Sequence, residues 1–144
     1  MRLDLYQAET ALIAEQQTAL LDEAMERLLA NSLLSRLEQN GVLHAIQLLV
    51  KNAVGKAKQL LKAHEKPVPL SAYDSFAGLL ELGLINERDI PAWDGAIGLR
   101  NKIVHDYMNI DMTRVLELVR QGQYRFITAF LLEPITVGTA AHRA

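Results

Sequence analysis

The chain has 144 residues, of which half are apolar and 22% are charged. This is the composition of one globular domain with a buried core, and it excludes a chain that is disordered over most of its length. A net charge of −2 excludes a protein that binds nucleic acid through overall basicity, so such a role needs a local patch. The lack of cysteine excludes a disulfide framework, a thiolate metal site and a cysteine nucleophile.

The sequence contains no run of about 20 apolar residues, so we expect no transmembrane helix and no membrane partner. Residues 1–5 lack the basic-then-apolar order of a secretion signal. The absence of cysteine fits a reducing compartment. We therefore expect a cytoplasmic protein.

Two long helices are predicted in the first half of the chain. Residues 3–30 contain neither Gly nor Pro and few β-branched residues, which favours one long helix. Residues 33–63 predict a second helix, because apolar residues recur every three or four positions from Leu43 to Leu61. The two-residue break between them favours adjacent, antiparallel packing.

A proline-rich break and a short helix follow. The segment 66–69 reads Lys-Pro-Val-Pro, and two prolines around one residue cannot continue a helix. Ser71 can cap a third helix over residues 72–82, which Gly83 closes.

A fourth helix is predicted to start near Asn86 and Asp89 and to reach about Tyr107, with Pro91 within its first turn. A fifth helix follows.

Asp111 can cap this fifth helix, which Gly122 interrupts only mildly. Its predicted inner side consists of Val115, Leu118, Val119, Phe126, Ile127 and Phe130. The expected architecture is an all-α bundle of about five helices, two of them long and antiparallel. It forms a single domain over residues 1–133, and residues 134–144 form a flexible C-terminal tail.

The most informative segment is Arg100-Asn101-Lys102-Ile103-Val104-His105-Asp106-Tyr107. Arg is a permanent planar cation suited to phosphate, and His can take and give a proton near neutral pH. On an ideal helix Arg100 and His105 lie about 140° apart, whereas Asn101 and His105 share one face. This geometry favours a composite site, in which two copies face each other across the axis of a homodimer.

The chemistry that fits such a site is cleavage of an RNA phosphodiester by its own 2′-hydroxyl. The two His105 residues could serve as base and acid, and Arg100 would stabilise the transition state. Asn101 could fix the His105 ring or bond the phosphate. No metal is required, and no carboxylate set for one is evident, because Asp94 and Asp106 are each alone.

Plainer interpretations are open for the same residues. One Arg and one His on a helix usually mean a surface ion pair and a satisfied polar residue. Lysines 51, 56, 58, 62 and 66 give the second helix a basic end. They form either a solvated face or a track in which Lys51, Lys58 and Lys62 contact the RNA backbone. His44 is interpreted as a packed or hydrogen-bonded residue.

The pattern R-N-x-x-x-H-x-Y resembles the signature of the HEPN superfamily and, within it, the HepT-like ribonuclease toxins. The resemblance extends over residues 43–132, including Ser71-Ala72-Tyr73-Asp74-Ser75-Phe76 and Gly98-Leu99-Arg100-Asn101. Family members often carry Asp-Ile-Ala midway along the second helix, where this chain has Gly55-Lys56-Ala57. This departure bears on substrate positioning more than on the chemistry.

The resemblance implies a homodimeric, metal-independent ribonuclease toxin of a type VII toxin–antitoxin pair, with catalytic Arg100 and His105 and with Asn101 as the accompanying polar residue. It also implies that an MntA-like minimal nucleotidyltransferase antitoxin modifies Tyr107 with AMP. The antitoxin takes that AMP from ATP, and the toxin needs no cofactor of its own. The alternative is a non-catalytic HEPN module that helps a nucleotidyltransferase hold a nucleotide or substrate. A third possibility is an interaction protein whose motif is vestigial.

Overall fold

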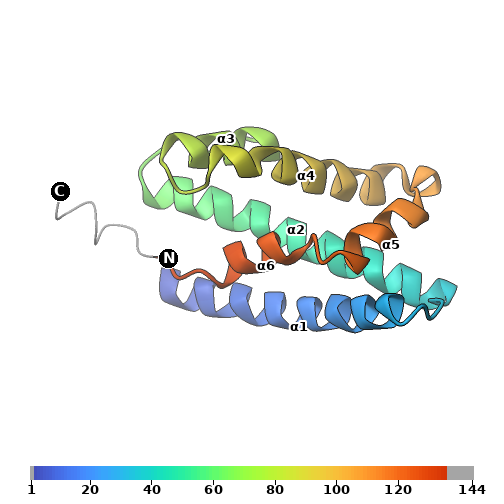
Figure 1. Ribbon diagram of the computed structural model, residues 1–144. Helices are drawn as coiled ribbons and strands as arrows, with labels where there is room; N and C mark the ends of the chain where they lie inside the picture. The colour runs from blue at the N-terminus through green and yellow to red at the C-terminus, as the bar shows by residue number, and fades with distance from the viewer. Residues whose placement is uncertain (1, 136–144) are drawn as a thin grey trace.

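The computed structural model describes residues 2–135, and all regular secondary structure in that range is helical (Figure 1). The predicted all-α class is therefore confirmed. The α-helices are α1 (Leu3–Leu29), α2 (Arg36–Ala63), α3 (Ala72–Glu81), α4 (Ile90–His105), α5 (Met112–Arg120) and α6 (Arg125–Leu132). Two short 3-10 helices, η1 (Glu87–Asp89) and η2 (Tyr107–Asn109), flank α4.

The long helix α2 lies at the centre of the bundle. It contacts α1 on one side, α3 and α4 on another, and α6 on a third. Figure 1 shows α1 and α2 running in opposite directions, and α4 also running opposite to α2. The C-terminal end of α4 therefore lies at the same end of the bundle as the start of α2.

The connection between α1 and α2 is longer than the two residues that the sequence predicted. It covers residues 30–35, because α2 begins only after Ser35. The Ser35 hydroxyl accepts from the Glu38 backbone N–H at 3.1 Å, and the Glu38 carboxylate accepts from the Ser35 N–H at 2.8 Å. This reciprocal capping box satisfies two N–H groups that the helix itself leaves free.

The predicted fifth helix is in fact two helices. Asp111 caps α5 as expected, accepting from the Arg114 N–H at 3.2 Å. However, Gly122 adopts a φ of +68°, and this left-handed conformation ends α5 and redirects the chain into α6. Of the predicted inner residues, Val115, Val119, Ile127 and Phe130 are buried, and Leu118 and Phe126 are half-buried.

Helix α4 begins at Ile90 and has Pro91 in its first turn, as predicted. Asn86 resembles a capping residue in the sequence, but its side chain makes no capping bond, and the acidic Asp89 directly precedes the helix without capping it. The helix ends at His105 rather than at Tyr107, because Asp106 leaves the helical conformation with a φ of −146° and a ψ of 45°.

The core contains one lysine that the sequence analysis placed on a basic surface. Lys56 is only 2% exposed, so it is not part of a basic end of α2. Its Nζ donates to the backbone oxygens of Phe130 at 2.7 Å and of Glu133 at 2.5 Å. The ammonium thus bonds carbonyl groups that the end of α6 leaves without helical partners. Burial lowers the pKa of Lys56 to about 8, and the Glu133 carboxylate opposes that shift.

Only the first two residues of the predicted tail, Pro134 and Ile135, are described by the structure, and Ile135 packs against the core. Residues 136–144 lie outside the described residues. Between residues 2 and 135, no helix is both long and apolar enough to cross a membrane.

Candidate functional site at the C-terminal end of helix α4

Arg100 and Asn101 are in contact on the last two turns of α4. Arg100 is half-buried, and its Nη1 donates to the Asn101 side-chain oxygen at 3.4 Å. The Arg100 Nε atom is buried and has no hydrogen-bond partner within residues 2–135. A buried donor without a partner is unfavourable.

His105 is the last residue of α4, and its side chain is exposed. Asn101 lies one turn earlier on the same face, as expected for residues four apart. In the described part of the chain, however, no hydrogen bond joins Asn101 to His105, because the Asn101 oxygen faces Arg100. Arg100 is thus half-buried and bonded to its neighbour, whereas His105, five residues later on the same helix, is exposed.

Tyr107 lies in η2 directly after this helix, and its side chain is 47% exposed. Its hydroxyl donates a hydrogen bond to the side-chain oxygen of Asn40, near the start of α2. A second bond, from Asn109 Nδ2 to Asp106 Oδ1 at 2.7 Å, holds the turn locally. Asn40 is a residue that the sequence analysis missed, since it lies 67 positions away from Tyr107.

The three predicted RNA-contacting lysines are spread along α2. Lys51 and Lys62 are exposed, whereas Lys58 is half-buried and donates to the Leu70 backbone oxygen at 3.0 Å. With a rise of about 1.5 Å per residue, Lys51 lies about 16 Å along the helix from Asn40, and Lys58 and Lys62 lie about 27 and 33 Å away. Lys51 is therefore the closest of the three to Tyr107.

His44 is exposed on α2, one turn after Asn40. The interpretation of His44 as a packed residue is therefore wrong. Its position instead places a second imidazole at the same end of the bundle as His105, because α2 starts where α4 ends (Figure 1).

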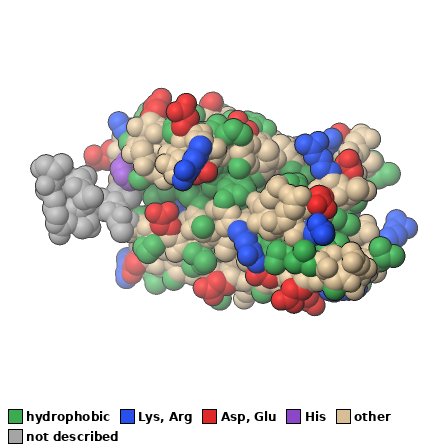
Figure 2. Space-filling model, viewed as in Figure 1, with side chains coloured by type: hydrophobic (Ala, Val, Ile, Leu, Met, Phe, Trp, Pro, Cys, Tyr) green, Lys and Arg blue, Asp and Glu red, His purple; other side chains and the backbone are tan. Residues whose placement is uncertain are grey.

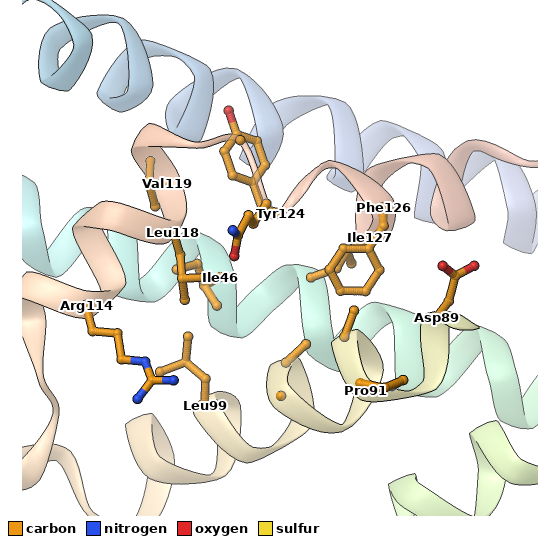
Figure 3. A pocket seen from close by; sticks show the side chains of 15 residues that line it. Ile46, Asp89, Pro91, Leu99, Arg114, Leu118, Val119, Tyr124, Phe126 and Ile127 are labelled. Carbon is orange, nitrogen blue, oxygen red and sulfur yellow. The ribbon is translucent and has the colours of Figure 1, made fainter. Parts of the chain in front are cut away.

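An apolar groove of about 670 Å³ lies on a different side of α4, between that helix and α5–α6. Figure 2 shows hydrophobic side chains gathered in this seam. In Figure 3, Arg114 and Asp89 mark its two ends, and the Tyr124 hydroxyl points away from it toward α1, where it bonds Asp22. Leu99 lines the groove, but Arg100 does not. The groove is therefore separate from the Arg100–His105 end.

Within residues 2–135, no group of three or more His, Cys, Asp or Glu side chains is arranged to hold a metal ion. The side chains of the motif at the end of α4 offer a guanidinium, an amide, an imidazole and a phenol, with the exposed Lys102 ammonium and Asp106 carboxylate beside them.

A family model described as ribonuclease HepT-like matches residues 14–133. The chain belongs to this HepT-like family. The match covers α2 to α6 and includes the whole segment from Arg100 to Tyr107. The family membership expected from the R-N-x-x-x-H-x-Y pattern is therefore confirmed.

Two solved structures share the HepT-like fold. One is the tri-AMPylated HEPN toxin of Shewanella oneidensis in complex with an MNT antitoxin, with a TM-score of 0.63 and 20% identity over 83% of this chain and 96% of that chain. The other is a toxin–antitoxin crystal structure with AMP-PNP, with a TM-score of 0.62 and 18% identity over 83% of this chain and 97% of that one. No curated protein gives a significant sequence match. The expected HEPN-type bundle is confirmed by these likenesses.

Proposed function

We propose that this protein is a metal-independent endoribonuclease and the toxin of a toxin–antitoxin pair. The observation that carries the proposal is the arrangement at the end of α4 in a HepT-like chain: a half-buried guanidinium, an exposed imidazole five residues later, and an exposed tyrosine just beyond. The imidazole and the guanidinium are groups that RNA cleavage by an internal 2′-hydroxyl can use, and the tyrosine is the proposed site of modification.

In the proposed reaction, the 2′-oxygen attacks the adjacent phosphorus and the bond from phosphorus to the 5′-oxygen breaks. One His105 takes the 2′ proton, and the His105 of a second subunit protonates the leaving 5′-oxygen. Arg100 stabilises the negative charge that develops on the phosphoryl oxygens. The products are a 2′,3′-cyclic phosphate and a 5′-hydroxyl.

A homodimer is part of the proposal, because residues five apart, as Arg100 and His105 are, lie about 140° apart around an ideal helix. Two copies that meet at the ends of their α4 helices would place two guanidinium and two imidazole groups in one groove. Lys51, which is exposed and nearest to Tyr107 among the α2 lysines, would contact the RNA backbone beside that groove.

The proposed regulator is an MntA-like minimal nucleotidyltransferase that transfers AMP from ATP to Tyr107. The two structural neighbours support this partner, since one is described as a tri-AMPylated HEPN toxin with its MNT antitoxin and the other as a toxin–antitoxin with AMP-PNP. AMP on Tyr107 would add bulk and negative charge two residues from His105 and so repel an RNA phosphate.

A second candidate function is a non-catalytic module that binds a nucleotide or substrate for a nucleotidyltransferase. One observation favours it: Arg100 is half-buried and already bonded to Asn101, as a structural arginine would be. In that case the chain would bind nucleotides without cleaving RNA.

The test is a cleavage assay with purified protein and RNA in excess EDTA. The wild-type chain should yield cyclic phosphate ends, and Arg100→Ala and His105→Ala should each lower the rate about a hundredfold or more while remaining folded. Arg88→Ala, an exposed arginine in η1 at the opposite end of α4, is the matched control and should cleave normally. Equal cleavage by all variants would refute the proposal, and tight nucleotide binding without cleavage would support the second candidate.

A further inference from the structure

The Tyr107 hydroxyl donates a hydrogen bond to Oδ1 of Asn40, so η2 is joined to α2 through two side chains at the surface. Neither the family pattern nor the proposed chemistry assigns a role to Asn40. We infer that Asn40 is a positioning residue for Tyr107: it orients the hydroxyl for nucleotide transfer and loses its contact once the transfer is complete. The inference rests on the proposed modification of Tyr107.

The geometry before transfer follows from the chemistry of the two groups. An amide carbonyl accepts a hydrogen bond but does not take up the proton. Because the O–H bond of Tyr107 points to Asn40, the lone pairs of the phenolic oxygen point away from α2. The side chain of a residue that is 47% exposed would otherwise have several rotamers open to it. The bond selects one of them and so prepares the oxygen for attack.

The transfer of AMP to Tyr107 removes the hydrogen bond between Tyr107 and Asn40. The phenolic oxygen attacks the α-phosphorus of ATP, and a new O–P bond forms as the bond to the pyrophosphate oxygen breaks. Pyrophosphate leaves, and the phenolic proton passes to water or to a basic group of the nucleotidyltransferase. The modified oxygen carries no hydrogen, so it can no longer donate to Asn40.

The loss of this bond affects the segment that directly follows His105. In the unmodified chain, η2 is held to α2 by the Tyr107–Asn40 bond and is held locally by the Asn109–Asp106 bond. After AMP transfer the Asn109–Asp106 bond remains but the Tyr107–Asn40 bond is lost, so η2 is released from α2. Modification would then act in two ways, by adding AMP near His105 and by loosening the turn next to it.

The kinetic test uses the full chain, its cognate nucleotidyltransferase and ATP. Asn40→Ala should lower the kcat of AMP transfer about tenfold and leave the KM for ATP unchanged, because the hydroxyl loses its orientation but the nucleotide does not lose a contact. Asn40→Asp should restore the rate, since a carboxylate accepts the same bond. Asn52→Ala, a second asparagine of α2, is the control and should match the wild type.

A second readout separates this inference from the proposed function. Hydrogen exchange of the amides in Tyr107–Asn109 should be faster in Asn40→Ala and Tyr107→Phe than in the wild type, and equally so in both. If the nucleotidyltransferase never transfers AMP to the wild-type chain, the proposed regulation is wrong. The hydrogen-exchange comparison still tests whether the Tyr107–Asn40 bond holds η2. Wild-type kcat in Asn40→Ala, or unchanged exchange in both variants, would overturn the inference.

Discussion

The guanidinium of Arg100 donates to the side-chain oxygen of Asn101 at 3.4 Å, and Arg100 is half-buried. His105, one turn beyond Asn101, is exposed at the end of the same helix. One helix thus carries a half-buried guanidinium and, five residues later, an exposed imidazole.

The Arg100–Asn101 contact predicts that charge alone is insufficient at position 100. Arg100→Lys keeps the charge but loses the planar fork that can bond Asn101 and a phosphate at once. We expect the cleavage rate to fall about tenfold or more, with little change in the melting temperature. Single-turnover cleavage and circular dichroism measure the two effects. A lysine variant as fast as the wild type would show that the fork is not used.

The position of Lys51 predicts an unequal contribution of the α2 lysines to RNA binding. Lys51→Ala should raise the KM for RNA several-fold and weaken its salt dependence, because one phosphate contact is lost. Lys62→Ala is the matched control, since Lys62 is also exposed but lies about 33 Å along α2 from Asn40. Cleavage measured over a series of salt concentrations gives both values. Equal effects of the two substitutions would contradict this placement.

Gly122 is predicted to be a stability determinant because it ends α5 with a φ of +68°. Gly122→Ala should lower the free energy of unfolding by about 1 kcal/mol, the cost of a left-handed conformation for a residue with a Cβ. Gly41→Ala is a control that should change stability in the opposite direction. Gly41 is helical and open to solvent, so alanine there should raise the free energy of unfolding by about 0.5–1 kcal/mol. Urea denaturation compares the two. A neutral or stabilising Gly122→Ala would mean that the turn adjusts without strain.

Lys56 predicts a pH dependence of stability. Burial lowers its pKa in the folded chain to about 8, from the ordinary lysine value of 10.5. Between these values the unfolded chain binds more protons at this site, so the free energy of unfolding should rise with pH, by up to about 3 kcal/mol. Below pH 8 both forms are protonated and the contribution is constant. Urea denaturation of the wild type and of Lys56→Met from pH 7 to 10 measures this effect. If the free energy of unfolding changed with pH in the same way in both proteins, Lys56 would not be the group responsible.

Much of this fold was open to prediction from the sequence because the signals were local. Asp111 and Ser71 cap the helices that they were expected to cap, accepting from backbone N–H groups three residues ahead. The start of α2 also had a local signal that was not used, the Ser35-x-x-Glu38 capping box. The burial of Lys56 had one too, since Lys56 lies three residues after Ala53 and four before Leu60, within the apolar stripe.

The remaining features depend on contacts between distant segments. Gly122 costs only about 1 kcal/mol in a helix, so local preference could not decide between one helix and two. The packing of the following Tyr124, whose hydroxyl bonds Asp22 on α1, contributes to that choice. The Tyr107–Asn40 contact joins residues 67 positions apart, and no pattern in a single sequence marks such a pair. The motif could therefore be found from the sequence, but its supporting residue could not.

The central claim is that the His105 residues of two subunits act together in one site. The most direct measurement uses two copies of the chain fused in tandem, with His105→Ala in neither, one or both copies. A shared site predicts that a single substitution lowers RNA cleavage almost as far as the double substitution, because the reaction then lacks either its base or its acid. Half of the wild-type rate in the singly substituted fusion would show two independent sites and would contradict the proposed mechanism.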